Sequence, residues 1–160
     1  MDGRVVAPLT PWRSDPLLTA RFHPEFPDDL QVLVHDGGPK TSKNPPELIW
    51  ARIVGVREGD YEAIALNQPY QLASVKEGAH FLFRVRAAAP HPFLVSDEYR
   101  ADRPQWQVEP CTGCGVDELL DPPSRLASLS FRVPDGVVMQ AFTQGCPMCG
   151  KGHLVAQRKP

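Results

Sequence analysis

The stretch "ELIWARIVGVREGDYEAIALN", residues 47–67, decides the fold. Residues 47–56 and 61–67 are rich in the branched and aromatic residues that favour β-strands. Glu58-Gly59-Asp60 between them is a hairpin signal, so we predict two antiparallel strands joined by a tight turn. Because side chains alternate between the two faces of a strand, and Trp50 alternates with Ala51, we expect the Trp50 side chain to lie in the core.

Further strand patterns flank this hairpin. "LQVLVH", residues 30–35, ends at an Asp-Gly-Gly-Pro turn, and a strand at 79–85 follows a Glu-Gly turn. Such strand–turn–strand units are typical of small, strongly curved barrels of SH3 or OB type. Eighteen prolines and twelve glycines favour turns and short strands over long helices. We predict a mainly β (α+β) fold, with an extended segment at 1–28 and a small barrel-like domain at 29–92.

All four cysteines lie in two matched pentapeptides, "CTGCG" at 111–115 and "CPMCG" at 146–150. Each C-x-x-C closes a tight turn that aims two sulfurs at one point, and the following glycine lets the backbone fold around a metal. Two disulfides are the second interpretation, and a cytosolic location argues against them. A redox C-x-x-C is the third, but it usually opens a helix, and neither pentapeptide leaves room for one.

The doubled motif therefore favours one structural Zn²⁺ per chain, held by Cys111, Cys114, Cys146 and Cys149. His153 is a possible substitute ligand, but it is better placed at the start of the last strand, 153–159. We predict a helix that starts near Ser96 as N-cap, a strand before the first pentapeptide, and a hairpin from 128–133 and 137–144 before the second. Residues 93–160 are thus predicted to form a zinc-ribbon module.

The barrel segment carries the motifs of a known type of domain. It has a tryptophan-containing strand, a Gly-Asp hairpin, a Leu-x-Asn-x-Pro turn and a Lys-x-Gly element before a Phe-rich strand. In this order they resemble the DUF2314 type of bacterial domain of unknown function, over about residues 30–86. The resemblance rests on Trp50, Gly59, Asp60, Asn67, Pro69, Lys76, Gly78 and Phe83. Ala79 departs from the pattern, which has an acidic residue there. The resemblance implies a barrel-like module and no reaction.

Charge and missing motifs limit the function. The formal net charge is −2, and four thiolates with one Zn²⁺ would lower it to about −4, a poor basis for binding phosphates. The histidines lack the spacing of a catalytic metal site, and His35 with Asp36 at a strand end would be the first catalytic candidates. We expect no catalytic residues, and hence a non-enzymatic bacterial accessory protein that acts through contacts with a protein partner. The alternative is a nucleic-acid-binding module built on a small barrel and a zinc ribbon.

The sequence also bears on location. No apolar run approaches the length of about 18–20 residues that a membrane span needs, and the N-terminus lacks a signal-peptide pattern. We therefore expect a cytoplasmic protein with no membrane association.

Overall fold

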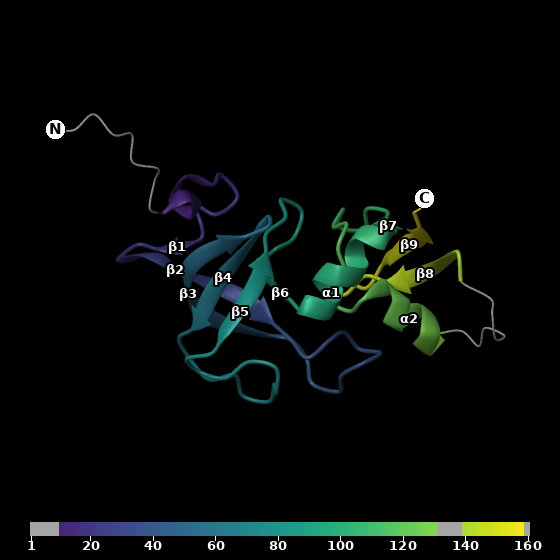
Figure 1. Cartoon of the computed structure of the whole chain (residues 1–160), viewed down its shortest axis with the longest axis horizontal. Coiled ribbons are helices and arrows are strands. Elements are labelled where there is room, and N and C mark those ends of the chain that lie inside the picture. The colour runs from purple at the N-terminus through teal and green to yellow at the C-terminus, as the bar shows by residue number, and fades with distance from the viewer. Residues whose placement is uncertain (1–9, 131–138, 159–160) are drawn as a thin grey trace.

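The described residues form two β-sheets, with a short helix between them (Figure 1). The structure is a computed structural model, and it describes residues 10–130 and 139–158. The first sheet has the order β1-β2-β3-β4-β5-β6, formed by Phe22–His23, Phe26–Val34, Glu47–Arg57, Asp60–Ala65, His80–Arg84 and Phe93–Val95. The second has the order β7-β9-β8, formed by Trp106–Val108, Gly152–Gln157 and Ala141–Gly145. The mainly β fold class is confirmed.

The helices are short. They are the 3-10 helices η1 and η2 and the α-helices α1 and α2, at Pro11–Ser14, Arg103–Gln105, Asp97–Asp102 and Pro123–Ser130. The predicted N-cap is confirmed, because the Ser96 side chain accepts a hydrogen bond from the Tyr99 backbone N–H at 3.1 Å. The strand predicted at 128–133 is wrong at its start, since α2 extends through Ser130; the rest of it lies outside the described residues.

No helix in the described ranges has both the length and the apolar character needed to cross a membrane.

The first sheet closes into a five-stranded barrel. Strands β2 to β5 form an antiparallel meander, β6 pairs antiparallel with β5, and β6 also pairs parallel with β2 through Leu33 and Phe93. The Leu33 N–H donates to the carbonyl of Pro92 at 2.8 Å at this closure. Closure leaves β2 and β6 without unpaired edges at this point, which confirms the predicted small curved barrel.

Strand β3 shows why one prediction failed. Its inward positions are Ile49, Ala51 and Ile53, each at most 2 % exposed, whereas Trp50 is 37 % exposed on the outer face. The prediction that Trp50 lies in the core is therefore wrong. Both faces of β3 carry apolar residues, so alternation alone does not tell which set is buried. The two isoleucines and the alanine fit the narrow barrel interior, whereas a tryptophan side chain is too large for it.

The β3–β4 hairpin has the turn that its sequence predicts. Glu58 and Gly59 have φ angles of 49° and 87°. Two successive positive φ values are the requirement of the type I′ turn, whose twist matches that of the flanking strands. Glycine meets this requirement without strain at the second position, and the predicted hairpin at 47–67 is confirmed.

The region that follows the barrel packs on its outer surface through a second apolar core. We call residues 106–158, which contain β7 to β9 and α2, the cysteine module. Barrel residues Leu82, Phe93 and Val95 share a buried cluster with residues of the module, among them Trp106, Val108, Leu119, Phe142 and Val155. The two sheets thus bury apolar surface against each other, and this second core is built from both of them, whereas the barrel interior uses only residues 12–94.

A buried carboxylate joins the two parts beside this core. Glu118, which is 1 % exposed, accepts hydrogen bonds from Arg84 at 2.9 Å, Arg86 at 2.8 Å and Arg103 at 3.0 Å, and from the Tyr99 hydroxyl. Arg84 belongs to β5 of the barrel, and Arg103 begins η2. Burial alone would raise the pKa of Glu118, but the arginines, Arg84 foremost, lower it below its usual value, so Glu118 is held ionised.

A second buried carboxylate extends the network. Asp60, 2 % exposed, accepts from Arg84 Nε at 2.8 Å and from Arg100 Nε of α1 at 2.8 Å. Arg84 therefore bridges Asp60 and Glu118, and the four arginines around the two acids connect β4, β5, α1 and the cysteine module. Removing one member leaves buried charges without partners, which is the costly way to break such a network.

We predict that Glu118→Ala lowers the free energy of unfolding by about 3–5 kcal/mol, because three guanidiniums lose their shared partner. The matched control is Glu98→Ala, which removes an exposed ion pair with Arg125 and should cost less than about 1 kcal/mol. Urea unfolding of both variants at pH 7 measures the difference. Equal losses for the two substitutions would contradict the role given to Glu118.

Candidate metal centre

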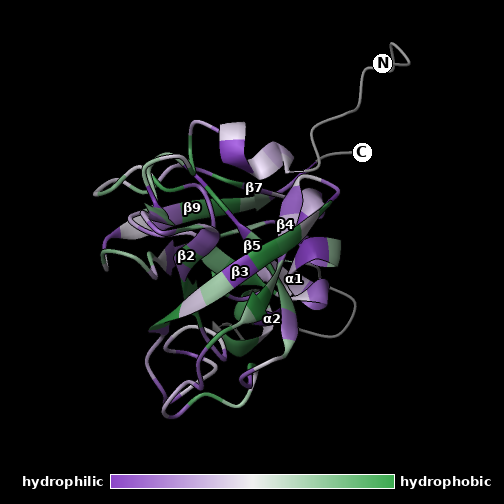
Figure 2. Cartoon of the chain, turned by 90° about the vertical axis from the view of Figure 1, so that its left-hand side faces the viewer, coloured by the Kyte–Doolittle hydropathy of each residue, from purple (hydrophilic) through white to green (hydrophobic). Residues whose placement is uncertain are grey.

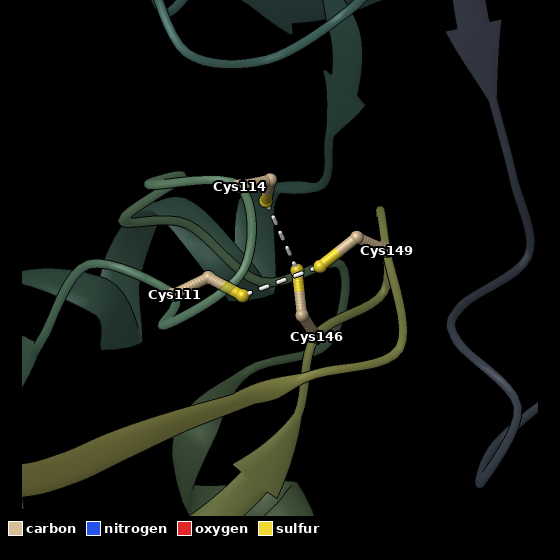
Figure 3. A group of neighbouring side chains, drawn as sticks. All are labelled: Cys111, Cys114, Cys146 and Cys149. Atoms are coloured by element: carbon tan, nitrogen blue, oxygen red, sulfur yellow. Dashed lines mark hydrogen bonds between the residues drawn. The ribbon is translucent and has the colours of Figure 1, made fainter.

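Four thiols converge in the cysteine module (Figure 3). Cys111, Cys114, Cys146 and Cys149 each offer one sulfur, and the four sulfurs lie within 4.8 Å of one another. Cys111 Sγ lies 3.4 Å from Cys149 Sγ, and Cys114 Sγ lies 3.7 Å from Cys146 Sγ. No disulfide joins them. The two C-x-x-C motifs therefore face each other across one point, as their spacing predicts.

Each motif forms the same backbone turn. Gly115 N–H donates to Cys111 O at 2.9 Å, and Gly150 N–H donates to Cys146 O at 2.9 Å. In each turn the first cysteine's sulfur also accepts a hydrogen bond from the backbone N–H two residues later. The Gly113 N–H lies 3.3 Å from Cys111 Sγ, and the Met148 N–H lies 3.4 Å from Cys146 Sγ. Such N–H donors stabilise thiolate over thiol. The matched pentapeptides are thus matched turns.

Glycine is required in each turn. Gly115 and Gly150 have φ angles of 82° and 84°, a region that other residues rarely adopt. Gly113 has a different reason, because a Cβ there would lie 3.0 Å from Cys149 Sγ and 2.4 Å from Lys151 Cγ. The two turns approach closely at this position, and the backbone Thr112 N–H donates to Gly152 O at 3.2 Å beside it.

The second sheet sets the distance between the turns. β8 ends at Gly145, immediately before Cys146, and β9 begins at Gly152 after the second turn, so the hairpin fixes that turn rigidly. β7 pairs with β9 and leads to Cys111 after two intervening residues. Hydrogen bonds between neighbouring strands therefore position both pairs of sulfurs.

The thiols differ in their surroundings. Cys111 and Cys146 are buried, Cys114 is half-buried and Cys149 is exposed. Burial acts to raise the pKa of Cys111, but backbone N–H groups of Cys114 and Gly113 lower it to about 6. Burial raises the pKa of Cys146 to about 12. Without a cation the four sulfurs do not all ionise at neutral pH, because each thiolate opposes the next, so a bound metal ion would supply the missing charge.

The geometry fits a tetrahedral ion. A metal–sulfur distance of about 2.3 Å gives a sulfur–sulfur separation of about 3.8 Å along a tetrahedral edge. The observed 3.4 Å and 3.7 Å are close to this value. Four sulfur ligands in this arrangement suit zinc or iron. An ion held by all four sulfurs would have a complete tetrahedral set of protein ligands and would leave no position for a water or a substrate.

His153 lies in β9, as the sequence predicts, and it is not a member of the cluster. Its side chain is 2 % exposed, and Nδ1 lies 2.8 Å from the carbonyl of Glu109. The ring therefore connects β9 to the segment that leads into the first cysteine turn, and so helps to position that turn.

His35 and Asp36, the first catalytic candidates from the sequence, serve the backbone. His35 is 4 % exposed, its Nδ1 accepts from Gly37 N–H at 3.0 Å, and Nε2 donates to Leu94 O at 2.9 Å. Asp36 accepts from the backbone N–H groups of Ala73 and Ser74. Burial lowers the pKa of His35 and so favours the neutral ring, and the two hydrogen bonds place its proton on Nε2. The pair thus ties the end of β2 to two other segments.

Two buried carboxylates that anchor the cysteine module carry no sequence signal. Glu118 and Asp121 lie in "VDELLDPP", which follows the first cysteine turn. Asp121 accepts from the Gly38 N–H at 2.9 Å and from the Thr41 hydroxyl, and so docks the loop after β2 onto the cysteine module. Their partners are 15 to 83 residues away in the chain, and no local spacing shows such pairs.

Fold and site together define a small β-barrel protein with an attached four-cysteine cluster that can hold a metal ion. No protein-family model, no curated protein and no solved structure matches the chain. The resemblance to the DUF2314 type of domain therefore stays a prediction.

We predict that the purified protein contains one metal ion per chain and that Cys111→Ser removes it, weakening binding by more than the roughly 10–100-fold that an outer-shell change costs. The control is Lys151→Ala, which alters a side chain beside the site but keeps all four sulfurs. Elemental analysis of the three proteins measures metal content. A full metal content in Cys111→Ser, or none in the wild type even after metal is added, would refute the site.

Proposed function

We propose that the four cysteines hold one structural zinc ion and that residues 93–160 act as a zinc-ribbon module. The complete tetrahedral set of protein ligands supports a structural ion, since catalytic zinc keeps one position open. Zinc also lacks redox chemistry, which suits a site with an exposed thiol at Cys149. The ion fixes the two turns, and through Val116, whose carbonyl accepts from Cys111 N–H at 2.8 Å, it steadies the segment that carries Glu118.

We further propose that the protein is a non-enzymatic accessory protein of the bacterial cytoplasm that acts through protein contacts. One observation carries this proposal: an apolar surface on the outside of the barrel. Phe26, Leu48, Trp50 and Val54, which we call the outer apolar face, are 51 %, 41 %, 37 % and 40 % exposed. The His23 ring joins two of them, with its centroid 5.1 Å from that of Phe26 and 5.4 Å from that of Trp50.

Most of the outer apolar face belongs to β3, and its border at Leu48 adjoins Leu33, which packs against the core shared with the cysteine module. Figure 2 views the molecule from the barrel side of Figure 1, and β3 crosses the front of this view. The module therefore does not cover this side. Exposed apolar side chains grouped on one side of a sheet commonly mark a site of protein contact. Aromatic residues such as Trp50 contribute strongly to such contacts.

The charges favour a protein partner over nucleic acid. Arg84, Arg100 and Arg103 are only 13–15 % exposed and pair with Asp60 and Glu118. The charges of these arginines are neutralised by buried carboxylates, so they do not form a basic face on the surface. Phosphate binding needs several exposed cations, so we propose that nucleic acid is not the ligand.

Affinity capture with mass spectrometry from the native bacterium tests the proposed protein contact. Leu48→Glu places a charge in the outer apolar face, and we expect it to remove the captured protein. Leu154→Glu, at a residue 51 % exposed on β9, is the matched control and should retain the captured protein. If the two variants captured the same proteins, the outer apolar face would not be the site of protein contact.

We predict that the protein does not bind random single- or double-stranded DNA or RNA tightly at about 150 mM salt, with affinity below that of non-specific binders at about 10⁻⁴–10⁻⁶ M. Fluorescence anisotropy with labelled oligonucleotides measures it. Sub-micromolar binding that weakens steeply with added salt would establish the nucleic-acid alternative instead.

A further inference from the structure

The cysteine cluster is most open to solvent at Cys149. This residue is exposed, whereas Cys111 and Cys146 are buried and Cys114 is half-buried. Beside the Cys149 sulfur lie Gly113, which has no side chain to cover it, and Lys151, which is itself exposed. Sulfurs that hold a metal ion are thiolates, and the thiolate is the form of cysteine that reacts with oxidants. A small oxidant in solution therefore meets Cys149 first.

The Cys149 sulfur faces a sulfur of the other turn. Cys111 Sγ lies 3.4 Å away, and Figure 3 shows the two sulfurs pointing toward each other from opposite turns. The other close contact of two sulfurs, between Cys114 and Cys146 at 3.7 Å, also joins one turn to the other. A disulfide bond is about 2.0 Å long, so Cys111 and Cys149 need to approach by only about 1.4 Å to form one.

We propose that Cys149 is an oxidation site, and that a hydroperoxide such as hydrogen peroxide exchanges the bound ion for a disulfide between Cys149 and Cys111. The inference rests on the proposed function, since it adds a form of regulation to the proposed zinc site.

The oxidation proceeds in two displacements. The Cys149 thiolate attacks one peroxide oxygen, the O–O bond breaks, and a sulfenic acid forms while hydroxide leaves. The Cys111 thiolate then attacks the Cys149 sulfur, so that the S–S bond forms, the S–O bond breaks and a second hydroxide leaves. The two sulfurs are oxidised, the two peroxide oxygens are reduced, and Zn²⁺ keeps its oxidation state. Cys114 and Cys146 alone offer too few ligands for a structural site, so the ion is released.

The exchange keeps the two turns together. Cys111 and Cys149 belong to different turns, so their disulfide connects the same two segments that a bound ion connects. The hydrogen bond from Cys111 N–H to the Val116 carbonyl is then retained, and the segment that carries Glu118 stays restricted. Chelation of the ion from the reduced chain removes the connection and puts nothing in its place. A disulfide within one turn would likewise leave the two turns unconnected.

Peptide mapping of the full zinc-loaded chain after treatment with hydrogen peroxide identifies the disulfide. Trypsin cuts after Arg125, between the two cysteine motifs, so a disulfide across the turns joins two peptides and one within a turn does not. We expect the joined peptides, together with the release of one zinc ion per disulfide, which a chromogenic chelator measures. Excess dithiothreitol should restore the four thiols and the binding of added zinc.

Two serine variants form a matched pair, because each loses one sulfur of the cluster. Cys114→Ser keeps Cys111 and Cys149 and should still give the joined peptides. Cys149→Ser should give them at least about tenfold more slowly, since its remaining cysteines are buried or half-buried. Both variants lose one metal ligand, so the difference between them reports on the sulfur that reacts. The wild-type map decides the pairing even where a variant does not fold.

Hydrogen exchange tests the structural consequence. The oxidised, zinc-free chain should protect residues 111–120 more than the reduced chain from which a chelator has removed the zinc. Equal protection in the two states overturns the exchange of ion for disulfide. A disulfide within one turn, no disulfide at all, or zinc that stays bound after oxidation also overturns it and leaves the proposed zinc site standing. A chain that takes up no zinc overturns both.

Discussion

The buried carboxylate of Glu118 is the constraint on which both parts of this protein depend. An ionised group at 1 % exposure is stable only with charged partners, and three arginines and a tyrosine supply them. These partners come from the barrel and from the segment around α1, whereas Glu118 follows the first cysteine turn. One carboxylate thus sets how the barrel, the helix and the cysteine module are oriented, because each must bring its donor to the same point.

The metal centre and the barrel are connected through this carboxylate. Cys114 and Glu118 are separated by three residues, and the Val116 carbonyl between them accepts a hydrogen bond from Cys111 N–H. A metal that closes the two turns therefore restricts the segment that carries Glu118. The shared apolar core, which includes Leu82, Val95, Trp106 and Val155, also holds the barrel and the cysteine module together. Loss of an ion bound by the four cysteines would therefore disturb the junction as well as the cysteine turns.

The two faces of strand β3 have different surroundings. Its inner residues Ile49, Ala51 and Ile53 fill the barrel, and its outer residues carry the outer apolar face around the Arg52–Asp29 pair. The register with β4 shifts between Ile53 and Gly55, an irregularity that ends the simple alternation. An outer face this apolar is unusual for a solvated antiparallel sheet, where polar residues normally alternate with buried ones.

The sequence by itself determined the features that depend on neighbours in the chain: the Glu58–Gly59 turn, the Ser96 cap and the two cysteine turns with their glycines. Each follows from backbone conformations or hydrogen bonds within a few residues. Tertiary structure alone decided which face of β3 carries Trp50, how β2 meets β6, and that Glu118, Asp60 and Asp121 serve as anchors. Those features join residues far apart in the chain, and a buried charge looks like any surface charge until its partners are in place.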